Sequence, residues 1–124
     1  MAIENKARDK SEAFALRIVK LYKYLKNEHN EYVISQQILR SGTSIGANLA
    51  EAECAISRKD FTAKIYIALK ECSETRFWLR LLYKSNYIDQ NAFRSIYRDS
   101  EELIRILSAT TKTLTEGSRK DEIL

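Results

Sequence analysis

The chain has 124 residues, which is enough for one domain with a core of its own. It contains no proline and three glycines, so the residues that usually break helices and shape β-turns are nearly absent, and we expect an all-α protein. The net charge of +4 comes from 21 basic and 17 acidic side chains, a mild excess that favours anionic partners only weakly.

Neither the N-terminus nor any later stretch has the apolar run of a signal peptide or of a membrane span, so we expect a cytoplasmic protein without a membrane partner. The two cysteines, Cys54 and Cys72, fit a reducing compartment and do not form a disulfide framework. With His29 as the single histidine, no Cys/His metal site can be assembled, and we expect no cofactor.

The first helix is predicted over residues 9–30. Its apolar residues recur at the spacing of three and four that gives a helix one apolar face, and they are Phe14, Ile18, Leu21, Tyr22 and Leu25. One flank of this helix carries basic residues, which are Lys6, Lys10, Arg17 and Lys20. The NEHNE run then supplies the polar break, and His29 in the last turn suits the carbonyl end of the helix dipole.

The second helix, predicted over residues 33–55, contains the unusual stretch LRSGTSIGANLAEAE. Its inward row is Ile34, Ile38, Ser41, Ile45, Leu49 and Ala52. A glycine inside a helix costs roughly 1 kcal/mol relative to alanine, so we expect Gly42 and Gly46 to mark a close approach of another helix. A polar row shares one side of the helix at spacings of four, four and three, and it consists of Arg40, Ser44, Asn48 and Glu51.

The third helix is predicted over residues 58–85, with Ser57 as its N-cap and Asp60 at the third helical position. Its core residues are Phe61, Ile65, Ala68, Leu69, Cys72, Leu79, Leu82 and Tyr83. The fourth helix is predicted over residues 89–116, capped by Asp89 and stopped by Gly117, with residues 118–124 as a frayed polar tail.

The inward positions of the fourth helix are Phe93, Ile96, Tyr97, Ser100, Leu103, Ile104, Leu107, Thr111 and Leu114. Four helices joined by short connections predict an up-down-up-down antiparallel four-helix bundle. The sequence shows no repeat, linker or second domain, so residues 1–124 are predicted to form one domain.

Several large apolar residues of the third helix point away from its core row, and they are Tyr66, Ile67, Phe77, Trp78 and Leu81. In an isolated bundle they are expected to be exposed, and a contiguous aromatic patch usually marks an interface. We therefore predict a homo-oligomer with closed cyclic symmetry. The alternative is that irregular packing or the loops cover these side chains.

Arg76 lies in register with the inward row of the third helix, where a guanidinium needs a partner. One explanation pairs it with Glu51, while Ser44 and Asn48 supply further hydrogen bonds. The other places Arg76 at the edge of the seam, from which its head reaches water. Together with the polar row of the second helix, Arg76 is predicted to have a mainly structural role between the second and third helices.

With LRSGTSIGANLAEAE and ALKECSETRFWLRLLYKSNYI both in view, the chain resembles a bacterial four-helix-bundle family that includes proteins encoded by intervening sequences inside 23S ribosomal RNA genes. More distantly, it resembles the accessory protein of diversity-generating retroelements. The likeness runs from about residue 9 to residue 114, and its most specific positions are Arg40, Ser41, Ser44, Ile45, Asn48, Glu51, Ala68, Leu69, Glu71, Ser73, Glu74 and Arg76. The family usually has glycine where this chain has Ala52.

This resemblance implies a ring-shaped homo-oligomer, a homopentamer, whose biochemical function is largely unassigned. The retroelement relative associates with a reverse transcriptase and with nucleic acid through a basic surface. The resemblance therefore implies RNA, DNA or a nucleoprotein such as a reverse transcriptase complex as candidate partners. The location of a gene inside ribosomal DNA does not by itself indicate that its product binds rRNA.

Two basic stripes are the candidate nucleic-acid surfaces. The first helix contributes Lys10, Arg17 and Lys20, and the fourth contributes Arg94, Arg98, Arg105 and Lys112. Glu101 interrupts the second stripe. Repeated around a ring, such stripes form a broad positive surface that binds phosphates without reading sequence. For any single helix, a solvated face explains the same pattern.

Catalytic patterns are absent from the sequence. His29 has no cysteine or serine beside it to activate, and neither a Glu-x-x-His pair nor a G-x-x-x-x-G-K-[ST] loop occurs. Cys54 and Cys72 each have one arginine four residues later, which is too little to activate a thiol. We therefore expect a non-catalytic oligomeric accessory module that binds nucleic acid or a nucleoprotein. The alternative is a protein-interaction scaffold oligomer without a nucleic-acid role.

Overall fold

This computed structural model describes residues 2–123, and their side chains through residue 116. Within that range the chain forms four helices and no strand, so the prediction of an all-α protein is confirmed. The helices are α1 (Asn5–His29), α2 (Ile34–Glu53), α3 (Arg58–Lys84) and α4 (Gln90–Ile123).

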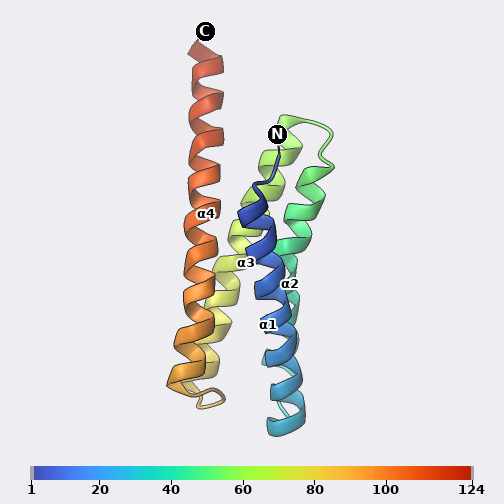
Figure 1. The fold of residues 1–124 in the computed structure, drawn as a ribbon, viewed down its shortest axis with the longest axis vertical. Helices are drawn as coiled ribbons and strands as arrows, with labels where there is room; N and C mark the ends of the chain where they lie inside the picture. Colours follow the sequence, from blue (N-terminus) through green and yellow to red (C-terminus); the bar gives the residue numbers. More distant parts are fainter. Residues whose placement is uncertain (1, 124) are drawn as a thin grey trace.

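The four helices lie side by side along the long axis of the molecule (Figure 1). The connections α1–α2 and α3–α4 lie at one end, and the α2–α3 connection lies at the other end, near the N-terminus. Each helix packs against its neighbours in the chain, and α4 also packs against α1. Among the described residues α1 does not pack against α3, nor α2 against α4. The α1–α2 seam and the α3–α4 seam therefore lie on opposite faces of the molecule.

Local structure explains three of the helix boundaries. The Oγ atom of Ser57 accepts the Asp60 N–H at 3.0 Å, and Oδ1 of Asp89 accepts the Ala92 N–H at 2.8 Å. Both predicted caps are confirmed. After α1, Asn30 adopts the left-handed conformation (φ 51°), which ends the helix.

The first and the fourth helix depart from their predicted ranges by several residues. α1 begins at Asn5, four residues before the predicted start. α4 continues through Gly117 to Ile123, so the predicted stop and the predicted tail are wrong over these residues, and Leu124 lies outside the described residues. Glycine permits a helix to end but does not force it to, and no proline follows Gly117.

The core is built from the predicted apolar rows. Its largest fully buried apolar side chains are Phe14, Ile18, Leu25, Ile38, Ile45, Leu49, Ile65, Leu79, Leu82, Leu103 and Leu107. A Cβ atom at Gly42 would lie 2.7 Å from Cγ1 of Ile18, and one at Gly46 would lie 3.3 Å from Oγ of Ser11. The glycines of α2 therefore allow α1 to approach closely, as their position in the sequence predicted.

Candidate functional site

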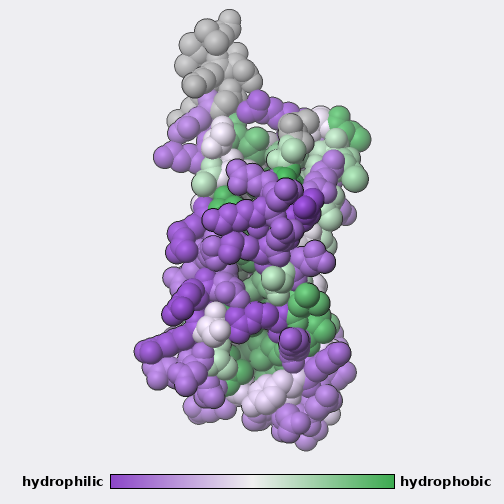
Figure 2. All heavy atoms as spheres, in the orientation of Figure 1, coloured by the Kyte–Doolittle hydropathy of each residue, from purple (hydrophilic) through white to green (hydrophobic). Residues whose placement is uncertain are grey.

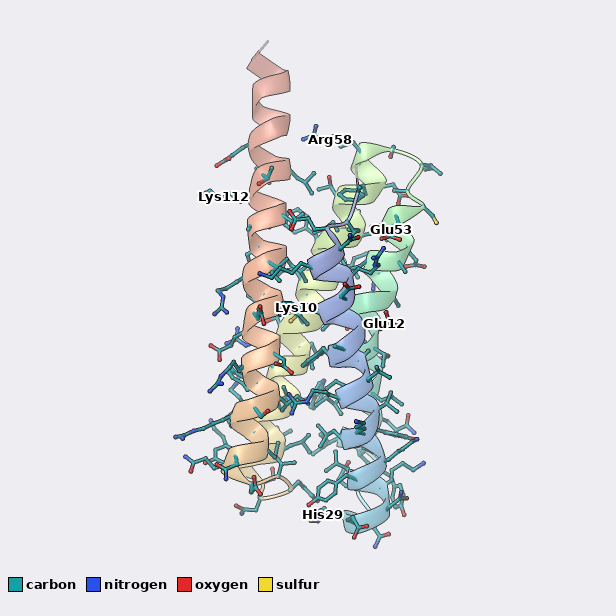
Figure 3. All side chains as sticks on the ribbon, viewed as in Figure 1. Lys10, Glu12, His29, Glu53, Arg58 and Lys112 are labelled. Carbon is teal, nitrogen blue, oxygen red and sulfur yellow. The ribbon has the colours of Figure 1, made fainter. Side chains whose placement is uncertain are left out.

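The outer face of α4 carries the basic stripe that the sequence predicted. Arg94, Arg98, Arg105 and Lys112 are all exposed, and none of them forms an ion pair or hydrogen bond with another described side chain. In Figure 3, Lys112 projects from α4 away from the other three helices. The exposed carboxylate of Glu101 interrupts the stripe. The four cationic groups are thus presented to solvent with their hydrogen-bond donors available.

The basic residues of α1 are used differently. Nζ of Lys10 lies 2.9 Å from Oε1 of Glu102, and Nη1 of Arg17 lies 2.6 Å from Oδ2 of Asp99. The hydrogen bond from Lys10 lowers the pKa of Glu102. Lys20 remains exposed. Two of the three candidate residues on α1 therefore hold α1 against α4.

The seam between α3 and α4 contains two arginines that share one acceptor. Nη2 of Arg76 and Nη1 of Arg80 donate to the hydroxyl oxygen of Tyr97 at 2.9 and 3.0 Å, and the Arg76 guanidinium lies 4.9 Å from the Tyr97 ring centroid. The predicted pairing of Arg76 with Glu51 is wrong, because Arg76 lies on the α4 side of the inward row of α3. Glu51 instead lies 3.4 Å from Nζ of Lys64.

Within the described part of the chain, no acid pairs with these two arginines. Among the described residues, neither Arg76 nor Arg80 has a carboxylate within ion-pair distance, and the buried Nε of Arg76 has no hydrogen-bond partner. Arg94 lies three residues before Tyr97 on α4, so the seam adjoins the basic outer face of that helix. The two regions together place six cationic side chains on the α4 side of the molecule.

The polar row of α2 makes local contacts and contacts with α3. Nη1 of Arg40 lies 3.2 Å from Oε2 of Glu71, and Arg40 also pairs with Glu74. Oγ of Ser44 donates to the Arg40 carbonyl at 2.5 Å, and Nδ2 of Asn48 donates to the Ser44 carbonyl at 2.8 Å. These contacts lie where the sequence predicted a structural role for the row.

The outward residues of α3 differ in how far they reach solvent. Tyr66, Ile67 and Phe77 are exposed by 40%, 38% and 48%. Trp78 and Leu81 are half-buried, which corrects the expectation that all five are exposed. The Trp78 ring packs edge-on against Phe77 with centroids 4.9 Å apart, and Trp78 also contacts the core.

The face formed by α1 and α4 is mainly hydrophilic, but hydrophobic atoms gather between the lower halves of the two helices (Figure 2). A shallow pocket of about 240 Å³ lies here. It is lined by Arg17, Lys20, Leu21, Ile88, Ala92 and Ile96. None of the described helices combines the length and the apolar character needed to cross a membrane.

The residues considered for catalysis lie apart from one another. Nε2 of His29 is 2.9 Å from the hydroxyl of Tyr24 at the end of α1. Cys54 is exposed, whereas burial raises the pKa of Cys72 to about 12, an effect that nearby Arg76 partly opposes. Within the described residues, no group of three His, Cys, Asp or Glu side chains could hold a metal ion.

Sequence reasoning missed two features. The first is Arg80, which donates to the same Tyr97 hydroxyl as Arg76. The two arginines are one helical turn apart, a spacing that could have indicated a shared partner. That this partner is Tyr97 depends on how α3 and α4 pack. The other feature is Glu31, whose carboxylate accepts three backbone N–H groups at the start of α2, including that of Ser35 at 2.6 Å. The signal in the sequence was the position of Glu31 just before α2, because an acid at the N-terminus of a helix interacts favourably with the helix dipole.

Comparison with known proteins identifies a family and a similar solved structure. A family model described as 23S rRNA-intervening sequence protein matches residues 4–109. The crystal structure at 1.70 Å resolution of a protein with unknown function from the S23 ribosomal protein family, from Bacteroides thetaiotaomicron VPI-5482, is 55% identical in sequence, with a TM-score of 0.84. That match covers 86% of this chain and 98% of the other. Among curated proteins no match is found.

Proposed function

This chain belongs to the family of 23S rRNA-intervening sequence proteins, and from that premise we propose that it is a non-catalytic, oligomeric accessory module. In this proposal it binds nucleic acid, alone or within a nucleoprotein, through the outer face of α4. The observation that carries the proposal is that Arg94, Arg98, Arg105 and Lys112 are exposed and form no ion pair or hydrogen bond with a described side chain.

The distribution of charge on α4 supports this role. Asp99 and Glu102 point toward α1 and pair with Arg17 and Lys10, so these two acids are occupied on the inner side of the helix. The outer side keeps its four cations and two exposed acids, Glu101 and Glu116. Such a surface attracts a polyanion even when the net charge of the whole chain is modest.

The length of the stripe suits a nucleic-acid backbone. Residues 94 and 112 are separated by roughly 27 Å along a helix that rises 1.5 Å per residue. At 3.4 Å per nucleotide along one strand of a duplex, that distance corresponds to roughly eight phosphates. Flexible arginine and lysine side chains on one helix face contact phosphates rather than base edges, so we expect binding without strong sequence preference.

We further propose that the protomer is an up-down-up-down antiparallel bundle, that it assembles into a ring-shaped homo-oligomer, and that it acts in the cytoplasm. The order of helix packing and the positions of the connections support the topology. The exposed Tyr66, Ile67 and Phe77 support assembly, because a soluble protein rarely leaves such side chains uncovered. Light scattering tests the assembly, and a monomeric mass would contradict it.

A gel-shift titration with matched variants tests the binding. The triple variant Arg94→Gln, Arg98→Gln, Arg105→Gln removes three charges from the outer face of α4. The control triple Lys23→Gln, Lys26→Gln, Lys84→Gln removes three charges outside the two basic stripes. With mixed RNA and DNA at low salt, we expect the α4 variant to bind at least tenfold more weakly than wild type, and the control variant to bind within about threefold of it.

The second candidate function is a protein-interaction scaffold with no nucleic-acid role. It is favoured by the exposed apolar side chains of α3, which suit a protein partner. If wild-type protein shows no binding to RNA or DNA at low salt, the nucleic-acid proposal fails and the scaffold stands. If the two triple variants lose binding equally, the binding depends on the total charge of the protein and not on the outer face of α4.

A further inference from the structure

A shallow groove follows the outer seam between α1 and α2. It has a volume of about 320 Å³, and the small residues that line it are Ser11, Ala15, Thr43, Gly46, Ala47 and Ala50. Glu12 and Glu53 stand at its rim, and Figure 3 shows both on the side of α1 and α2 away from α4. Both carboxylates are exposed and form no ion pair with a described residue. Arg8 also lines the groove and lies 3.5 Å from its own neighbour Asp9.

A surface of complementary character lies on the outer face of α3. Ala63, Tyr66, Ile67 and Lys70 follow one another at the spacing that places residues on one side of a helix, and all four are exposed. Lys59 is exposed one turn before Ala63. Neither Lys59 nor Lys70 has an ion-pair partner among the described residues. This surface therefore offers apolar side chains between two lysines, and the groove offers small residues between two glutamates.

The groove and this surface lie at the same height along the bundle. The register of α3 against α2 is fixed by two contacts, which are Lys64 Nζ to Glu51 Oε2 at 3.4 Å and Thr75 Oγ1 to Ser41 Oγ at 2.9 Å. Residues 66–70 of α3 lie between these contacts, and so do residues 46–50 of α2. The two helices run in opposite directions, so a step forward in α3 matches a step back in α2. Counting from the first contact places Lys70 opposite residue 45, and counting from the second places it opposite Gly46.

The register of α1 completes the match. A Cβ atom at Gly46 would lie 3.3 Å from Oγ of Ser11, so Glu12, the next residue of α1, lies close to the height of Gly46. Lys70 and Glu12 are therefore level with each other on different faces of one protomer. Surfaces at equal height can be joined between copies by rotation about an axis parallel to the bundle, which is the operation that closes a ring.

We propose that the groove between α1 and α2 receives the outer face of α3 from a second copy of this chain. Ile67 then covers Ala47 and Ala50, and Lys70 pairs with Glu12 of the neighbouring copy. The contact is heterologous, because two different surfaces meet. The small floor residues let α3 approach closely, and the opposite charges at the rim set the register of the two copies. This inference rests on the proposed homo-oligomer and names the surfaces that form it.

Charge reversal with rescue tests this contact. Lys70→Glu places two carboxylates together at every interface, and Glu12→Lys places two ammonium groups together. We expect each variant to shift the size-exclusion and light-scattering mass toward the monomer, with assembly at least tenfold weaker than in wild type. The double variant Lys70→Glu, Glu12→Lys restores opposite charges, and we expect it to recover the wild-type mass.

Matched controls come from the outer face of α4. Lys112→Glu and Glu101→Lys make the same charge changes at exposed positions outside the proposed contact, and we expect both to keep the wild-type mass. Ala47→Trp provides a second route, because it fills the groove from an exposed position. We expect this variant to lose assembly while its circular dichroism keeps the helical content of wild type.

The possible failures of the two proposals can be told apart. If wild-type protein is a monomer, both the proposed oligomer and this interface are overturned. If wild-type protein assembles but Lys70→Glu, Glu12→Lys and Ala47→Trp all keep its mass, the oligomer stands and the interface lies elsewhere. If both single reversals dissociate the assembly and the double variant does not restore it, the pairing of Lys70 with Glu12 is overturned.

Discussion

The two flanks of α3 are held by their neighbours in different ways. Toward α2, the carboxylates of Glu71 and Glu74 face the guanidinium of Arg40. Deeper in this seam, the buried hydroxyls of Thr75 and Ser41 form a hydrogen bond of 2.9 Å. Opposite charges meet at the surface of the seam, and its buried polar groups satisfy one another.

Toward α4, α3 presents cations in place of acids. Arg76 and Arg80 both donate to the hydroxyl of Tyr97, which accepts hydrogen bonds without supplying a negative charge. Among the described side chains of α4, the acids that take part in ion pairs are Asp99 and Glu102, and both face α1 instead. The difference shows that the placement of the acids, more than the net charge of +4, determines which cations are neutralised across a seam and which are left without an ion pair.

The largest expected effect concerns the seam between α3 and α4. Although this seam contains two arginines, we expect it to exclude solvent as well as the seam between α3 and α2 does. Sγ of Cys72 lies 3.4 Å from the Ser100 carbonyl, and burial raises its pKa from 9.0 to about 12. At pH 8 the thiolate of Cys72 should be roughly a thousandfold rarer than in an unperturbed thiol. We expect Ellman's reagent to label Cys54 alone in the native protein and both cysteines after denaturation. Rapid labelling of two native thiols would show an open seam.

The same pKa gives a prediction for stability. Because the folded pKa of Cys72 lies above its unfolded value, the unfolded chain loses this proton first as the pH rises above about 9. The contribution of the neutral buried thiol is therefore complete below that pH and declines as the pH approaches 12. Urea unfolding of wild type and of Cys72→Ala across this range measures the difference.

The next effect tests how tightly α2 is packed on its other side, against α1. Gly42→Ala places a Cβ atom 2.7 Å from Cγ1 of Ile18, a fully buried side chain. Overpacking of this kind costs about 1–3 kcal/mol of unfolding free energy, which thermal or urea unfolding can measure. Gly46→Ala is the control, because its Cβ atom meets Ser11 at 3.3 Å and alanine favours the helix. Equal stability of the two variants would contradict the tight contact.

A smaller effect is expected where α3 meets α4. Tyr97→Phe keeps the ring but leaves the guanidinium groups of Arg76 and Arg80 without their shared acceptor, so we expect a loss of about 1–2 kcal/mol in urea unfolding. Tyr32→Phe is the matched control, because its exposed hydroxyl donates only to Asn30. If the two variants are equally stable, the arginines do not depend on Tyr97.

The smallest effect is expected at the ion pairs between α2 and α3. Arg40→Gln removes the contacts with Glu71 and Glu74, but the Arg40 side chain is 49% exposed. Surface ion pairs of this kind contribute about 0.2–1 kcal/mol and are screened by salt. The difference between Arg40→Gln and wild type should therefore shrink as salt is added, whereas the effect of Tyr97→Phe should change less. A loss above that range, or one that salt does not reduce, would contradict this view.

The helices could be predicted from the sequence because several local signals agree. Apolar residues recur at helical spacing, and Ser57 and Asp89 mark helix starts with side chains that cap the backbone. The end of α4 could not be predicted in the same way, because Gly117 is compatible both with a helix end and with a helix interior.

The contacts of the candidate site were harder to predict because they depend on which helices are neighbours. Helical spacing placed Arg76 on the inward side of α3 but did not say that it faces Tyr97 on α4 instead of Glu51 on α2. Spacing also grouped Lys10 with Arg17, yet it could not show that acids of α4 lie within ion-pair distance of both. Charge on a helix face is visible in a sequence, whereas its neutralisation across a seam is a tertiary property.

The salt dependence of nucleic-acid binding tests the central claim most directly, namely that the outer face of α4 contacts phosphates. Each cation that contacts a phosphate contributes about 0.7–0.9 to the slope of log K against log salt concentration. The triple variant Arg94→Gln, Arg98→Gln, Arg105→Gln should therefore lower that slope by about two to three, and the control triple Lys23→Gln, Lys26→Gln, Lys84→Gln should leave it unchanged. A slope that stays at the wild-type value in the α4 variant would contradict the account.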